Sequence, residues 1–284
     1  MMRVFLHSVS LAAILILGGA LAAYSQTPAV ATGGVLNAFS NDKTGQPLAP
    51  GSLISIYGTE LAASLSQSGS IPLSNSLSGV SVTVNNLPAP LLFVSPGQIN
   101  AQVPWETLAL LPPGTNGTTQ VPMVVTRGSA LSAPMNLTVG TAAPGIATFQ
   151  SGVGPAIAVN GDGSIAAPAN AGLPFSSHPA KAGDVLVMYA TGLGAVDTTV
   201  ANGDVPKVIT SKALSQPTVL VGGKSAPVAF AGLVGRDSSG IAQGFVGVYQ
   251  INFTVPPGAG TGTVPLQIQM NGVTSRSDVT IALQ

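Results

Sequence analysis

The feature that most constrains the fold of this chain is an internal repeat. Gln98-Ile-Asn-Ala-Gln-Val-Pro104 returns as Gln250-Ile-Asn-Phe-Thr-Val-Pro256. Three more blocks recur in the same order: 50–58 returns at 182–190, 87–93 at 224–230, and 121–125 at 264–268. Ordered self-similarity of this kind indicates a duplicated structural unit. We therefore predict two homologous domains, 35–143 and 144–284, each of ordinary domain size.

Short β-prone runs separated by turn residues fill both repeats. Val80, Val82 and Val84 alternate with Ser81 and Thr83, which is typical of a strand with one buried face. Pairs of Asn and Gly, which suit tight hairpin turns, separate such runs at 85–86, 116–117, 160–161, 202–203, 222–223 and 271–272. The predicted fold class is all-β, with two tandem immunoglobulin-like β-sandwich domains. The Cys…Trp…Cys pattern of antibody domains is missing, because the chain has no cysteine.

The scarcity of charge excludes several classes of function. Charged residues make up 6% of the 284 residues, and nine Lys and Arg balance nine Asp and Glu. A nucleic-acid binder needs basic patches that the chain lacks, and a disordered chain would not be 45% hydrophobic. The absence of cysteine excludes disulfides, thiolate zinc sites and thiol nucleophiles. Because net charge near zero gives little colloidal protection, self-association is plausible.

The first 25 residues have the order of a secretory signal peptide. Arg3 precedes an apolar run at 9–17, and small residues follow it. Cleavage is expected after Ala22 or Ser25, leaving 26–34 as a linker. The alternative is an uncleaved anchor, which needs about 20 consecutive apolar residues, and the glycines at 18–19 interrupt the run. We predict an exported protein without a membrane span after cleavage, located in the periplasm, at the cell surface or outside the cell.

Several longer strings resemble a known family. They are APGSLISIYGTELA at 49–62, SGVSVTVNNLPAPLLFVSPGQINAQVPWE at 78–106, GDVLVMYATGLGAVD at 183–197 and GVYQINFTVP at 247–256. Together they resemble the Solibacter-type C-terminal domain family of secreted acidobacterial proteins, and the first string also resembles the start of TIG-type immunoglobulin-like domains. The resemblance implies fold and compartment. It implies no activity, because that family has no established catalytic residues.

Candidates for catalysis are few. His178 is the only histidine after the leader and lies in a loop-like stretch, and no G-x-S-x-G elbow is present. A glycosidase would need two converging carboxylates, for which Glu60 and Glu106 are the only glutamates. We interpret His178 as a surface loop residue, and most carboxylates as turn and capping residues. The chain is predicted not to be an enzyme.

Metal and cofactor motifs are equally weak. Asn160-Gly-Asp-Gly-Ser164 resembles part of a calcium loop, but one aspartate supplies too little charge, and a hairpin turn explains it better. The glycines at 152–154, 192–194 and 258–262 do not open a helix, as a dinucleotide site requires, and are interpreted as turns and corners. We predict no metal and no cofactor.

The sole tryptophan breaks the symmetry of the repeat. Trp105 follows the first QIN block, whereas Pro257 stands at that place in the second. Trp105, with Glu106, could form a sugar-stacking or protein-contact site, or Trp105 could fill the seam between the domains. The leading hypothesis is an exported adhesion, scaffold or interaction module whose partner is an unknown extracellular protein or polysaccharide. The alternatives are a carbohydrate-binding module near Trp105 and, third, a secreted hydrolase.

Overall fold

The structure is a computed structural model that describes residues 27–111 and 116–284. Their regular secondary structure is β-strand, apart from a short 3₁₀ helix, η1 (Trp105–Leu110). The expected signal peptide at 1–25 lies outside the described residues. Within the described ranges, no helix has the length and apolar character that crossing a membrane requires. The all-β prediction is confirmed.

The N-terminal half folds into two sheets that face each other. The first has the order β1-β2-β8-β7-β3, and the second β10-β9-β5-β4, with β11 added to β9 and β6 to β5. Their strands are β1 (Ala29–Asn37), β2 (Leu53–Thr59), β3 (Ser66–Gln67), β4 (Ser76–Leu77), β5 (Val80–Val84), β6 (Leu87–Ala89), β7 (Leu91–Val94), β8 (Gln98–Gln102), β9 (Thr118–Arg127), β10 (Ala130–Leu131) and β11 (Met135–Gly140). The alternating valines of β5 are buried and Ser81 and Thr83 are half-buried, so one face of this strand builds the core as predicted.

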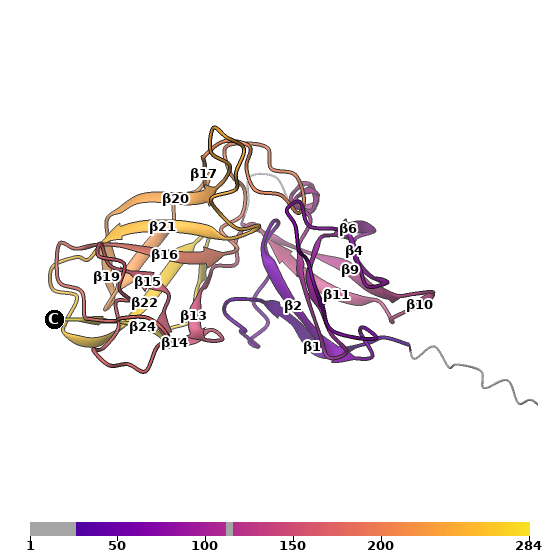
Figure 1. Cartoon of the computed structure of the whole chain (residues 1–284), viewed down its shortest axis with the longest axis horizontal. Coiled ribbons are helices and arrows are strands. Elements are labelled where there is room, and N and C mark those ends of the chain that lie inside the picture. Colours follow the sequence, from indigo (N-terminus) through magenta and orange to yellow (C-terminus); the bar gives the residue numbers. More distant parts are fainter. Residues whose placement is uncertain (1–26, 112–115) are drawn as a thin grey trace, which may run out of the picture.

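The C-terminal half repeats the arrangement. One sheet has the order β12-β16-β21-β20-β17 with β15 added to β16, and the other β13-β14-β24-β22-β18-β19 with β23 added to β22. The strands are β12 (Gly145–Ile146), β13 (Thr148–Gln150), β14 (Val153–Ala156), β15 (Ala158–Val159), β16 (Val185–Thr191), β17 (Thr210–Lys212), β18 (Thr218–Val221), β19 (Lys224–Ala226), β20 (Val228–Val234), β21 (Tyr249–Thr254), β22 (Gly262–Met270), β23 (Val273–Thr274) and β24 (Val279–Leu283). Figure 1 shows the two sandwiches side by side, with loops next to β17 above their junction.

The duplicated sequence blocks occupy equivalent places in the two sandwiches. In the first, Ile56 of β2 pairs with Ile99 of β8, and in the second Met188 of β16 pairs with Ile251 of β21. Each of these pairs joins the same two repeat blocks. The buried side chains of both strands then pack against the opposite sheet of their own sandwich. The prediction of two tandem immunoglobulin-like sandwiches is therefore confirmed in strand order and in register.

The predicted turns are correct in three hairpins. Both residues have positive φ at 85–86, 222–223 and 271–272, as the favoured two-residue hairpin turns require. Two other pairs differ, because neither Asn160 nor Asn202 has a positive φ. The Asn160 side chain instead donates a hydrogen bond to Ser164 Oγ (3.0 Å), which closes a longer turn, and Asn202 contacts the other domain.

The start of the first sandwich also differs from expectation. Strand β1 begins at Ala29, and it pairs with β2 on both sides of a bulge between Val30 and Val35. Most of the segment expected to be a linker, 26–34, is therefore part of the first sheet. The glycines at 33–34 lie within that bulge.

Candidate functional site

The first feature of interest is the seam between the sandwiches, where Trp105 and Glu106 lie. The Trp105 backbone N–H donates to Asn202 Oδ1 (2.8 Å), and Asn202 Nδ2 donates to Glu106 Oε2 (2.6 Å). The half-buried indole packs against the core of the second sandwich. It lies so close to Gly51 that a Cβ there would be 2.1 Å from the ring. The structure thus places Trp105 in the seam, and a sugar-stacking role for it stays a prediction.

Hydrogen bonds between backbone and buried side chains connect the two sandwiches at further points. Thr191 Oγ1 of β16 accepts from the Leu53 N–H of β2 (3.0 Å) and donates to the Gly247 carbonyl (2.7 Å). Gln102 Oε1 accepts from the Gly203 N–H (2.7 Å), and the Gly203 carbonyl accepts from the Leu73 N–H (2.7 Å). Because these groups are specific in position and direction, they fix the angle between the sandwiches.

One close backbone approach reinforces this angle. Gly152, with a φ of 100°, lies in the turn between β13 and β14, and a Cβ there would be 2.0 Å from the Ser40 carbonyl oxygen. Only glycine accommodates both the conformation and the contact. The loop after β1 and the β13–β14 turn are therefore held together, which matters because both border the main cavity.

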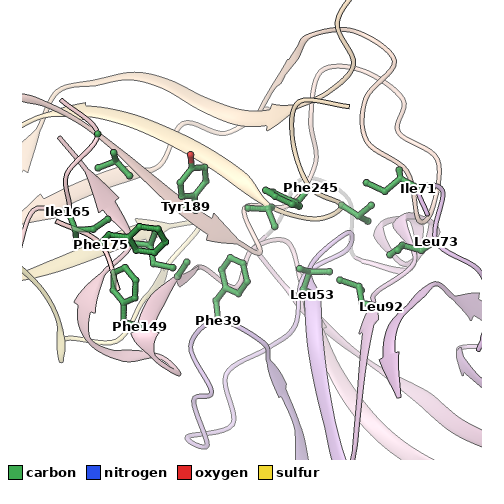
Figure 2. A pocket seen from close by; sticks show the side chains of 16 residues that line it. Phe39, Leu53, Ile71, Leu73, Leu92, Phe149, Ile165, Phe175, Tyr189 and Phe245 are labelled. Carbon is green, nitrogen blue, oxygen red and sulfur yellow. The ribbon is translucent and has the colours of Figure 1, made fainter. Parts of the chain in front are cut away.

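That cavity is an apolar cleft of about 750 Å³ between the two sandwiches, here called the cleft (Figure 2). The first sandwich contributes Phe39, Leu53, Ile71, Leu73 and Leu92. The second contributes Ala147, Phe149, Ile157, Val159, Gly163, Ile165, Phe175, Tyr189, Phe245, Val246 and Val248. No charged side chain is among these described residues. The volume lies in the range of ligand-binding pockets.

Aromatic side chains form much of the wall and rim. Phe149 and Phe175 contact each other with ring centroids 6.1 Å apart and planes inclined by 49°. Phe175 is 62% exposed and Phe245 is 71% exposed, although both are large and apolar. Exposed aromatic residues beside a concave apolar surface are typical of binding sites. The sequence did not reveal this site, because its residues come from strands and loops that lie far apart in both repeats.

The loop position predicted for His178 is confirmed, but the residue has partners that the sequence did not show. Its Nε2 lies 3.0 Å from Asp162 Oδ2, and its Nδ1 lies 2.9 Å from the Pro179 carbonyl oxygen. These two bonds, first that to Pro179, raise the pKa of His178 above 6.5. Hydrogen bonds from Ser164, with His178 contributing less, lower the pKa of Asp162 to about 2.

This cluster does not have the geometry of a catalytic triad. Ser164 Oγ donates to Asp162 Oδ1 (2.7 Å), so the serine contacts the carboxylate and the imidazole contacts the same carboxylate through its other oxygen. In a catalytic triad the serine hydroxyl donates its hydrogen bond to the imidazole, and the carboxylate contacts the other side of the ring. In the segment compared above with a calcium loop, Oδ1 of Asp162 is thus engaged by Ser164, and Oδ2 by His178 from outside that segment. Among the described residues, no group of three or more His, Asp or Glu could hold a metal ion.

The two glutamates are engaged at separate places. Glu60 forms an ion pair with Arg127 at 2.7 Å, and Glu106 accepts from Asn202 in the seam. The glycines at 192–194 shape a corner, as expected, since a Cβ at either would lie 2.1 Å from a backbone carbonyl oxygen. The Tyr249 hydroxyl donates to the Gly194 carbonyl at this corner, and burial raises the pKa of Tyr249 above its usual range.

Fold and site together define a two-domain immunoglobulin-like β-sandwich protein with an apolar cleft between the domains. Residues 40–139 match the model of the IPT/TIG domain family, which confirms the TIG-type resemblance for the first sandwich. The match covers a minority of the chain, and the Solibacter-type resemblance stays a prediction. No curated protein matches the chain.

Comparison with solved structures gives only distant likenesses. Two structures of the Plexin A4 full extracellular region have TM-scores of 0.24 at 8% and 9% identity, covering 91% of this chain and 18% and 16% of those chains. An endo-fucoidan hydrolase from glycoside hydrolase family 107 has a TM-score of 0.15 at 9% identity, covering 84% of this chain and 42% of that chain. The chain thus spans less than a fifth of the plexin chains. With such low scores, these likenesses carry no functional inference.

Proposed function

We propose that this protein is an exported, non-catalytic interaction module in which two domains, 35–143 and 144–284, hold a partner protein in the cleft. The observation that carries the proposal is the apolar lining of the cleft, with Phe175 and Phe245 exposed at its rim. Leaving such side chains in water costs free energy of about 25 cal/mol per Å² of apolar surface. Burial against a partner recovers that free energy.

A protein partner fits better than a small molecule because the exposed apolar surface continues beyond the cleft. Phe245 belongs to a loop that also exposes Ile241 (62%), and backbone hydrogen bonds join this loop to one that exposes Val208 (48%) and Ile209 (51%). The bonds run from the Gly235 N–H to the Ile209 carbonyl and from the Arg236 N–H to the Pro206 carbonyl (both 2.9 Å). The two loops are therefore joined, and together they expose apolar side chains that do not line the cleft as well as Phe245, which does.

The seam supports the proposal because it makes the cleft preformed. The bonds of Thr191, Gln102 and Asn202 between the sandwiches involve only groups of the chain itself. A binding site whose walls are already ordered loses less entropy when the partner arrives. Export is supported by the leader-like sequence at 1–25, and cleavage after Ala22 or Ser25 is testable by mass spectrometry of the protein recovered outside the cytoplasm.

Site-directed photo-crosslinking in the exporting cell tests the function. A photoreactive amino acid at position 245 should give a discrete adduct, which the same amino acid at position 131 should not give. Leu131 is a matched control, since it is 59% exposed on β10 of the first sandwich and does not line the cleft. The partner identified should bind the purified chain, and Phe245→Ser should weaken that binding about tenfold or more.

Three results would contradict the proposal. One is the same adducts from positions 245 and 131, and another is unchanged affinity in Phe245→Ser and Phe175→Ser. The third is a crosslinked dimer of this chain as the sole adduct, which would assign the cleft to self-association instead.

A further inference from the structure

One wall of the cleft is formed by two segments that a side-chain pair outside the cleft joins, beside a hydrogen bond from Asn160 Nδ2 to the His178 carbonyl (3.3 Å). His178 and Asp162, here called the clasp, join two segments that both contribute to that wall. Asp162 precedes Gly163 and Ile165, and His178 follows Phe175 in the loop 166–177. The backbone joins these segments only next to Ile165, whose N–H donates to the Ser176 carbonyl (2.8 Å) and whose carbonyl accepts from the His178 N–H (3.1 Å). Phe175 lies just beyond this short ladder.

The atoms around the imidazole require two ring protons. The Pro179 carbonyl can only accept a hydrogen bond, and so can the ionised Asp162 carboxylate, so both Nδ1 and Nε2 must donate. A neutral imidazole has one N–H and would leave one of the two contacts without a proton. Ser164 donates through both its N–H (3.0 Å) and its Oγ to Asp162 Oδ1, and this orients Oδ2 toward the ring.

We propose that the clasp is a pH-sensitive device that fixes the Phe175 loop as a wall of the cleft, held while His178 carries both ring protons and released when it loses one. The proposal deepens the proposed function, since it assumes that the cleft binds. Other charges near the ring are few. Asp184, before β16, also favours the imidazolium, and Lys181 lies between them along the chain and donates its N–H to Asp184 (2.9 Å). The pair is exposed, with side-chain exposures of 46% for His178 and 60% for Asp162, so the expected effect is modest.

The shifts of the two groups define the working range. Because the pKa of Asp162 is about 2, its carboxylate is available as an acceptor well below neutral pH. Because the pKa of His178 is raised above 6.5, the ring keeps its second proton into the range where an unperturbed histidine loses it. The clasp is thus held in mildly acidic surroundings and released as the pH rises through the pKa of His178.

The experiment uses three readouts on the full chain. The first is an NMR titration of the His178 ring, assigned by its loss in His178→Gln. The second is the ¹⁹F shift of 4-fluorophenylalanine at position 175. The third is the affinity for N-phenyl-1-naphthylamine, an uncharged apolar fluorescent probe, measured from pH 5 to pH 9. We expect the pKa of His178 to be raised in the wild type and to fall in Asp162→Asn. The ¹⁹F shift should change with pH along the same curve as the His178 titration, and the affinity for the probe should drop about threefold as His178 loses its proton. His178→Gln should flatten the ¹⁹F and probe curves.

The readouts separate the failure of the clasp from that of the cleft. A His178 titration that is ordinary and unchanged in Asp162→Asn overturns the clasp, even if the probe binds. A raised pKa with a flat ¹⁹F curve overturns the link between the clasp and the loop. A probe that does not bind at any pH, while the ¹⁹F signal follows His178, counts against the cleft as an apolar binding site, on which the proposed function depends, and leaves the clasp supported. Phe175→Ala should abolish most probe binding, and Leu131→Ala should not.

Discussion

Thr191→Val is the perturbation that tests most directly how the two sandwiches are joined. Thr191 is fully buried, and its hydroxyl serves two backbone groups of the seam, the Leu53 N–H and the Gly247 carbonyl. Valine has nearly the same shape and fills the same space. The substitution therefore removes the two hydrogen bonds and leaves the packing almost unchanged.

The expected magnitude follows from the two groups left behind. Each buried backbone group without a partner costs about 1–3 kcal/mol, so Thr191→Val should lower the free energy of unfolding by about 2–6 kcal/mol. Thr191→Ser is the matched control, because it keeps the hydroxyl and loses one methyl group, at a cost of about 1 kcal/mol. The serine variant should therefore be the more stable of the two.

Urea denaturation followed by tryptophan fluorescence measures this effect at the right place. Trp105 is the only tryptophan in the chain and lies in the seam, so its emission reports on the opening of the seam. Far-ultraviolet circular dichroism reports on the sheets. We expect Thr191→Val to shift the fluorescence midpoint to lower urea than the dichroism midpoint. If Thr191→Val unfolds within about 0.5 kcal/mol of the wild type, or if Thr191→Ser is the less stable variant, the hydroxyl does not join the sandwiches as described.

Three further predictions follow from particular contacts. Gly51→Ala should lower the free energy of unfolding by more than about 3 kcal/mol, because its Cβ would lie 2.1 Å from the ring of Trp105. Gly79→Ala is the control, since Gly79 has nearly the same φ (75° against 74°) but lies in open space, and it should lower that free energy by about 1 kcal/mol. Thermal denaturation of both variants measures the difference. Asn202→Ala should cost about 1–2 kcal/mol and shift the tryptophan emission, and an unchanged spectrum would contradict the seam contact. The contribution of His178 to stability should be complete below pH 6.5 and lost as the pH rises through its raised pKa. That of Asp162 should be complete above pH 3.8 and lost as the pH falls toward about 2. Midpoints of thermal unfolding across pH measure both limbs, and His178→Gln should flatten the upper limb while most of the acidic limb remains.

The sheets were predictable from the sequence because their signals are local and repeated. The alternation in 80–84 and the QIN blocks each reflect one strand, and strand β8 pairs with β2 in the register that strand β21 adopts with β16. Turn chemistry is local as well, so 271–272 could be assigned from two residues. The backbone conformation of a tight turn depends on the few residues that form it, so their types predict it.

The seam and the cleft were not predictable, because their residues belong to segments far apart in sequence. Asn202-Gly203 has the composition of a hairpin turn, yet its side chain and backbone contact Trp105, Gln102 and Leu73 of the other domain. Asp162 and His178 also lie in different turns. Their pairing depends on how the loop between them folds back, which cannot be predicted from the number of residues that separate them. The asymmetry of Trp105 within the repeat was the one sequence signal that pointed to the seam.

The cleft lies where the two copies of the repeat differ. The first copy connects β7 to β8 through the short turn at 95–97, and the second connects β20 to β21 through the long loop at 235–248, which carries Phe245. The second copy likewise has the long segment 160–184 before β16, which carries Phe175 and the clasp. Strands that must pair and pack retain the pattern of the duplicated unit, whereas loops are free to change in length. The seam contacts therefore hold the sandwiches at a fixed angle, and the extended loops of the second copy line the cleft that lies between them.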